Sequence, residues 1–154
     1  MRKQDFKQKI FCTVTIWRSS VGFLDIFKKN KPKLNEDQLK IDKMWNLWTE
    51  GKAQSPYAEL MTYQSEVGNG GHSQYFFNVE NAGDLQKELA VLERILPVKF
   101  SENLQRAYKA YLALEENEDD EAAEATLEHC DDIFYENESE INALLEEYAA
   151  KIKL

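Results

Sequence analysis

Apolar residues recur at helical spacing along most of the chain, and this pattern constrains the fold more than any other feature of the sequence. Leu85, Leu89, Leu92 and Leu96 follow one another at intervals of three or four residues, so they share one face of a helix. Outside residues 10–17, no stretch shows the alternation of apolar and polar residues that a half-buried strand requires. The pattern therefore predicts an all-α fold.

Capping residues and chain breakers divide this pattern into about seven short helices with brief turns between them. Side-chain oxygens suit the first turn of a helix, and proline is tolerated at its first position. Helix starts are predicted at Asn35, Ser55-Pro56, Gly83-Asp84 and Ser101. Helix ends are predicted at Gly51, at residues 68–71 and at Pro97. Apolar positions over 75–79, 123–134 and 141–152 add a short third helix and two final ones, so we expect a compact single-domain bundle.

The charges divide the chain into a basic beginning and an acidic body. The formal net charge is −9, from 19 Lys and Arg against 28 Asp and Glu. Residues 1–34 contain nine basic and two acidic side chains, whereas residues 115–147 contain 15 acidic ones and neither Lys nor Arg. We therefore expect a basic N-terminal arm over 1–34 and a helical domain over 35–154. A chain this acidic is not expected to bind nucleic acid directly, because phosphate contacts need clustered Lys and Arg.

The first 20 residues allow three interpretations. The β-branched and aromatic residues of 10–17 are typical of a short strand, and a basic arm without a packed partner is typical of disorder. The third interpretation is that translation starts at Val21 from a GTG codon, so that residues 1–20 are not native coding sequence. A signal peptide is disfavoured, because the apolar stretch contains two Thr and no small-residue cleavage site follows it. None of these interpretations places a functional site in residues 1–20.

Side chains suited to catalysis or metal binding are few. The only histidines are His72 and His129, and neither has the spacing of a paired metal motif. His129 and Asp132 can share a helix face, but two ligands are fewer than zinc requires. Cys12 and Cys130 cannot form a disulfide framework, and Cys130 falls on an apolar helix face, as a buried thiol does. We therefore expect no enzyme activity, no metal, no cofactor and no membrane span, in a cytoplasmic protein.

A glycine-rich turn is the most specific motif in the chain. Its residues are Glu66, Asn69, Gly70, Gly71, His72, Gln74, Tyr75, Phe76 and Asn78. The glycines permit positive φ angles, and Gln74 and Asn78 share a helix face from which they can reach the turn. Glu66 can accept hydrogen bonds there. The motif predicts either a structural corner with an internal polar network or a pocket for a small ligand, and both alternatives stay open.

These residues resemble the signature Glu-x-x-Asn-Gly-Gly-Phe-x-Gln-Tyr-Phe-x-Asn of a bacterial domain family of unknown function, best known through a DNA mimic. The family usually has Phe where this chain has His72, which removes an aromatic anchor and places a titratable group beside the turn. The resemblance implies an all-helical fold over 35–154. From the DNA-mimic member it also implies an acidic dimer that occupies the DNA site of a transcription regulator.

The acidic end of the chain is the predicted partner surface. Over residues 121–136 most acidic residues follow one another at spacings of three and four, opposite an apolar face. The predicted surface comprises Glu115, Glu116, Glu118, Asp119, Asp120, Glu121, Glu124, Glu128, Asp131, Asp132 and Glu136. Rows of carboxylates compete for the Lys and Arg groups that hold phosphates, so we expect a basic protein partner such as a DNA-binding regulator. An immunity or inhibitor protein against a basic toxin or nuclease would use the same surface, and a ligand-binding or enzymatic pocket at the Gly70-Gly71 turn is the other alternative.

Overall fold

The computed structural model describes residues 34–154 as a set of helices. Within this range the helices are α2 (Glu36–Thr49), α3 (Tyr57–Ala82), α4 (Leu85–Ile95), α5 (Val98–Glu116) and α6 (Glu121–Ala149). No residue from 34 to 154 is in a strand, so the all-α fold is confirmed there. The predicted strand over 10–17 and the predicted basic arm lie outside the described residues.

The prediction of seven helices is wrong, because two predicted breaks do not end a helix. The described part of the chain has five helices. The predicted second and third helices are the two halves of α3, which follow one another across a kink at Gly70 and Gly71, where the backbone leaves helical geometry. The predicted sixth and seventh helices are one helix, α6, since residues 135–140 contain neither Gly nor Pro and nothing interrupts the backbone hydrogen bonds.

The predicted caps at Asn35 and Asp84 are confirmed, whereas those at Ser55 and Ser101 are wrong. α3 begins at Tyr57, directly after Pro56, and no side chain caps it. Asn35 forms a capping box with Gln38 at the start of α2, and Asp84 caps α4 through the backbone N–H of Lys87. Gly51, just beyond α2, has a φ of 67°. Ser101 does not cap α5, because the helix already begins at Val98 and the N–H of Ser101 bonds the carbonyl oxygen of Pro97.

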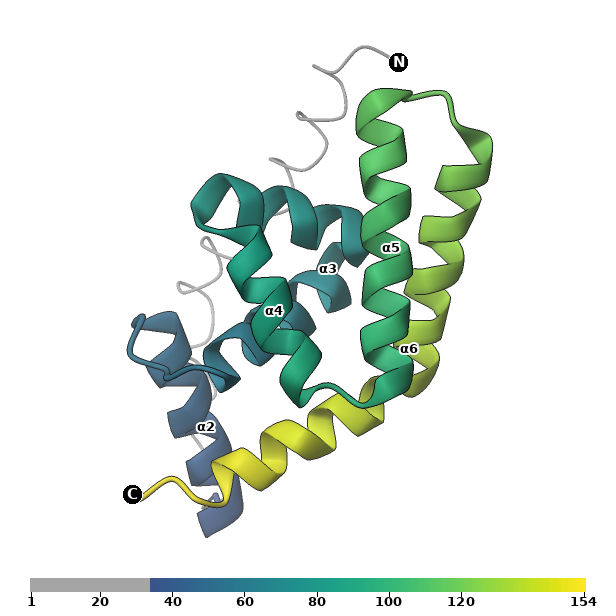
Figure 1. The fold of residues 1–154 in the computed structure, drawn as a ribbon. Coiled ribbons are helices and arrows are strands. Elements are labelled where there is room, and N and C mark those ends of the chain that lie inside the picture. The colour runs from purple at the N-terminus through teal and green to yellow at the C-terminus, as the bar shows by residue number, and fades with distance from the viewer. Residues whose placement is uncertain (1–33) are drawn as a thin grey trace, which may run out of the picture. The chain divides into compact units, whose positions relative to one another are not determined.

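The longest helices make the main contacts of the bundle. Figure 1 shows α5 and α6 running side by side in opposite directions, and the last part of α6 passing to α2. α3 packs against α4, α5 and α6. At its bend, Gly71 and His72 are buried, whereas the residues just before them, 68–70, are exposed. The rings of Tyr63, Tyr75, Phe76 and Phe134 are fully buried where α3 meets α6. Among the described residues, no helix combines the length and the apolar character that crossing a membrane requires.

Candidate functional site

The bend in α3 is made by two glycines, Gly70 and Gly71. Gly71 has φ 76° and ψ 179°, a backbone conformation that is essentially restricted to glycine. A Cβ atom on Gly71 would lie 2.2 Å from Oδ2 of Asp131, and one on Gly70 would lie 2.2 Å from Oε1 of Gln74. The motif thus requires glycine at 71 for its conformation, whereas a side chain at 70 would have to displace the flexible end of Gln74.

Asp131 of α6 holds the start of the second half of α3. Its Oδ1 accepts the backbone N–H of His72 at 2.8 Å and the His72 ring nitrogen Nδ1 at 2.6 Å. A bend in a helix frees backbone N–H groups, and a carboxylate satisfies them as it does at a helix N-terminus. Asp131 therefore acts as a capping group that comes from another helix.

The His72 ring completes a buried chain of hydrogen bonds. The ring is fully buried, and its Nε2 lies 3.1 Å from the hydroxyl oxygen of Tyr63. Because a carboxylate only accepts, Nδ1 carries the hydrogen bonded to Asp131, and in the neutral ring Nε2 accepts from Tyr63. Burial, with a smaller contribution from the charge of Asp131, raises the pKa of Tyr63, so that hydroxyl keeps its proton. His72 thus faces the core and does not line a pocket at the turn.

Glu66 joins the two halves of α3 through a different set of partners. Its Oε2 accepts hydrogen bonds from Gln74 Nε2 at 3.0 Å and from Asn78 Nδ2 at 2.7 Å. Gln74 also donates to the backbone oxygen of Glu66. These contacts match the internal polar network that the spacing of Gln74 and Asn78 suggests. Asn69 is exposed, so the structure does not bring all of the motif's polar residues into one site.

Two further residues of α6 hold the bend in place. Tyr135 donates to the backbone oxygen of Val67, which precedes the glycines, at 3.0 Å. Glu138 accepts from Gln64 at 3.0 Å. Asp131, Tyr135 and Glu138 follow one another at spacings of four and three, so they lie along one face of α6. This face of α6 therefore holds the two halves of α3 together across the bend. The spacing of these three residues in the sequence does not reveal that role.

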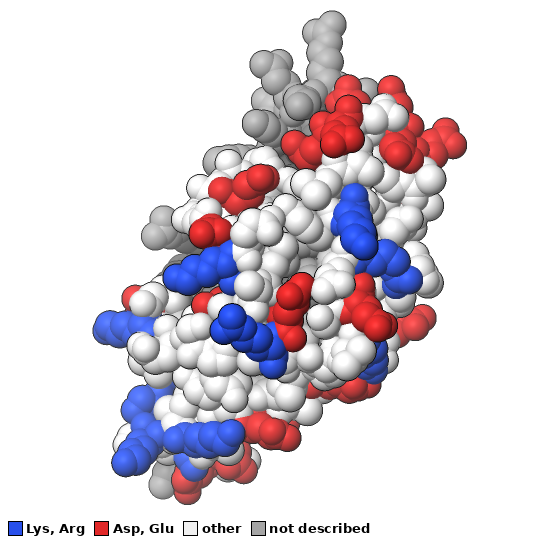
Figure 2. All heavy atoms as spheres, viewed as in Figure 1, with Lys and Arg blue, Asp and Glu red and all other residues white. Residues whose placement is uncertain are grey.

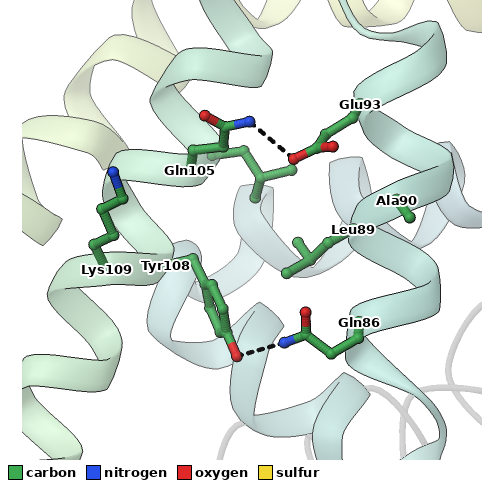
Figure 3. A pocket seen from close by; sticks show the side chains of 8 residues that line it. Gln86, Leu89, Ala90, Glu93, Gln105, Tyr108 and Lys109 are labelled. Atoms are coloured by element: carbon green, nitrogen blue, oxygen red, sulfur yellow. Dashed lines mark hydrogen bonds between the residues drawn. The ribbon is translucent and has the colours of Figure 1, made fainter.

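Two shallow hollows open on the described surface. One, of about 270 Å³, lies beside the bend, and Glu66, Asn78 and Glu88 are among its lining residues. The other, of about 220 Å³, lies between α4 and α5 (Figure 3). Two hydrogen bonds cross the second hollow, from Gln86 to Tyr108 and from Gln105 to Glu93, so polar side chains already fill part of it.

The acidic side chains form two exposed groups. We define the acidic ridge as the five exposed carboxylates along one side of α6, namely Glu121, Glu124, Glu128, Asp132 and Glu136. We define the acidic turn as the exposed carboxylates at the end of α5 and in the α5–α6 connection, namely Glu115, Glu116, Glu118 and Asp119. Acidic side chains gather over this end of the helix pair in Figure 2. The opposite face of α6 is buried through Ala123, Leu127, Cys130 and Phe134, as the periodicity predicts.

Two acidic residues of the predicted surface make contacts inside the protein instead. Asp131 bonds His72, and its side chain is only 25% exposed. Asp120 caps α6 through the N–H groups of Ala122 and Ala123. No hydrogen bond or ion pair joins the side chains of the ridge to another described residue. The ridge and the turn thus hold nine of the exposed carboxylates in the described part of the chain.

The remaining candidate side chains carry no site in the described part of the chain. Cys130 is fully buried, and burial raises the pKa of its thiol even though Arg106 lies against the sulfur. His129 is exposed on α6. No group of three or more His, Cys, Asp or Glu side chains among residues 34–154 has an arrangement that could hold a metal ion.

Comparison with known proteins gives one match. The DMP19-like protein family matches residues 52–152, a range that contains α3 to α6, the motif at the bend and the acidic ridge. A search of the curated proteins and a search of the solved structures found no match. Because the match covers most of the chain, the protein belongs to the DMP19-like family.

Proposed function

We propose that this protein is a non-enzymatic DNA mimic whose acidic ridge and acidic turn occupy the nucleic-acid site of a basic protein. The observation that supports the proposal is the set of nine exposed carboxylates that no cation among the described residues neutralises. Membership of a family named for a DNA mimic protein agrees with it. The partner's Lys and Arg groups, which otherwise hold phosphates, would bind these carboxylates instead.

The charge density of the ridge indicates how much surface the mimicry needs. At a rise of ~1.5 Å per residue, the five ridge carboxylates provide about one charge per 5 to 6 Å of helix. One strand of DNA carries one charge per ~3.4 Å of axis. The ridge alone is therefore less charged than a DNA strand, and we infer that the acidic turn is needed to complete the imitation.

Capture of the partner tests the proposal. The immobilised protein is incubated with lysate of the source cells at low salt, and retained proteins are eluted with duplex DNA and identified by mass spectrometry. A DNA mimic should retain a nucleic-acid-binding protein that the duplex releases, because DNA and mimic compete for one site. Retention should also weaken steeply as salt rises, since it depends on charge.

Two sets of substitutions with equal charge change distinguish the ridge from general acidity. The ridge variant combines Glu121→Gln, Glu124→Gln and Glu128→Gln. The control combines Asp37→Asn, Asp42→Asn and Glu102→Gln, which are exposed carboxylates outside both acidic groups. Capture should be lost in the ridge variant and kept in the control. Equal capture by both would contradict the proposal.

Capture also separates the alternatives. An immunity or inhibitor protein would retain a toxin or nuclease through the same carboxylates and suppress its activity. A ligand pocket at the bend would bind in a manner insensitive to salt, but the structure turns His72 away from such a pocket.

We further propose that the protein acts in the cytoplasm as a dimer, and light scattering after size exclusion should then give twice the mass of the 18.0 kDa chain.

A further inference from the structure

Three carboxyl groups lie where α4 packs beside the bend, and two of them, Glu59 and Glu66, act on the third, Glu88. Glu59 and Glu66 belong to the first half of α3, and Glu88 belongs to α4. Oε2 of Glu59 is buried without a hydrogen-bond partner among the described residues. Such an atom loses its hydrogen bonds to water without forming a new one in the protein, and this loss is unfavourable for an ionised group.

Glu88 connects this group to the second half of α3. Tyr75, which lies beyond the bend, donates a hydrogen bond to Oε1 of Glu88 at 3.2 Å. Burial raises the pKa of Glu88 to about 7, and the charges of Glu59 and Glu66 add to this rise against the hydrogen bond from Tyr75. Glu88 also lines the hollow beside the bend with Glu66.

No cation relieves the repulsion within this group. The ion pairs among the described residues are those of Glu36, Glu50, Asp131 and Glu140, and none includes Glu59, Glu66 or Glu88. The titratable groups that act on Glu88 are Tyr75, Glu59 and Glu66, all from α3. Burial raises the pKa of Tyr75 as well, so this hydroxyl remains a neutral donor. Within the described part of the chain, a proton is the means left to lower the charge of the group.

We propose that Glu59, Glu66 and Glu88 form a proton-dependent latch that holds α4 against α3. While Glu88 keeps its proton, the group carries less charge and α4 packs fully. When Glu88 ionises, the three carboxylates repel one another and α4 loosens beside the hollow. This inference does not depend on the proposed partner, and it concerns the face formed by α3 and α4.

The direction of the pH effect follows from the raised pKa of Glu88. The pKa of Glu88 is higher in the folded protein than in an open state, where it returns to its ordinary value of about 4.5. Below the pKa of Glu88 in the open state, the latch therefore contributes its full stabilisation of α4. This stabilisation is lost as the pH rises through about 7. Between pH 6 and pH 8 we expect local opening of α4 to increase about three- to tenfold, the lower figure allowing for screening by solvent.

Hydrogen exchange read by mass spectrometry tests the latch. The protection of peptides from α4 is compared at pH 6 and pH 8 after correction for the intrinsic exchange rate, with the last part of α6 as an internal reference. The wild-type protein should lose protection in α4 at pH 8, whereas Glu88→Gln should show no such loss, because its amide cannot ionise. Glu102→Gln, the same charge change at an exposed position on α5, should behave as the wild-type protein does.

A second variant keeps the test decisive if Glu88→Gln does not fold. Glu59→Gln removes one repelling charge and thereby lowers the pKa of Glu88, so the loss of protection in α4 should shift to lower pH. Constant protection of α4 from pH 6 to pH 8 in the wild-type protein would overturn the latch. So would the same loss in the wild-type protein and in Glu88→Gln.

Discussion

Two separate constraints meet at Gly71, the residue at which α3 bends. Its backbone conformation is one that only glycine adopts without strain, and its missing side chain leaves room for the Asp131 carboxylate. The carboxylate in turn bonds the backbone and the ring of His72. A substitution at Gly71 would therefore disturb both the conformation and the contact that stabilises it.

Gly71→Ala should lower the free energy of unfolding by more than about 2 kcal/mol, from strain plus the clash with Asp131. Gly51→Ala provides the matched control, because Gly51 also has a positive φ, of 67°, but no atom lies within 4 Å of the position that a Cβ would take there. Strain alone should cost Gly51→Ala about 1 kcal/mol. Urea unfolding followed by circular dichroism measures both, and equal losses would show that the contact with Asp131 contributes nothing.

The caps of the helices can be predicted from local sequence, whereas the contacts that join the two halves of α3 cannot. Caps at Asn35 and Asp84 act through residues three positions away, so they can be predicted from the sequence alone. The break at Gly70 and Gly71 and a helix beyond it can also be predicted, but not how the two halves of α3 are held together across the break. That arrangement depends on Asp131, which is 59 residues away from His72 along the chain, and on Tyr135, which is 68 residues from Val67. Contacts at such separations leave no periodic signal in one sequence.

The continuity of α6 makes a prediction at the scale of the element. Ser139 is exposed and lies within α6, in the segment where the sequence pattern predicts a boundary between two helices. Ser139→Pro should cost about 3 kcal/mol or more, because proline removes a backbone hydrogen bond and clashes with the preceding turn. Ser139→Ala should be neutral or slightly stabilising. Thermal unfolding of the two variants measures the difference, and a well-tolerated proline would indicate a break in α6 near this residue.

The charge of the whole molecule can be counted from the sequence, but the contacts that each charged group makes cannot. The sequence identifies residues 115–147 as acidic throughout. Only the packing shows that Asp131 is bound to His72, that Glu138 is bound to Gln64, and that Lys99 pairs with Glu140. The carboxylates of the ridge and turn make no such contact with another described side chain and stay exposed. Their mutual repulsion is unfavourable for folding, and solubility alone does not require so uniform a charge.

If the ridge serves to bind a partner, its carboxylates should lower the free energy of unfolding of the unbound protein. A second ridge variant, Glu128→Gln, Asp132→Asn and Glu136→Gln, leaves the first turn of α6 intact, where the helix dipole favours Glu121 and Glu124. It removes like charges spaced four residues apart on α6, each pair of which costs about 0.2–0.5 kcal/mol. We expect the free energy of unfolding to rise by about 0.5–1 kcal/mol at low salt and by less at high salt, where the repulsion is screened. The control with Asp37→Asn, Asp42→Asn and Glu102→Gln should show a smaller gain, because those carboxylates are dispersed over α2 and α5. Urea unfolding at two salt concentrations measures both variants. A ridge variant that is less stable than the wild-type protein would mean that these carboxylates support the fold, and the case for a surface reserved for a partner would fail.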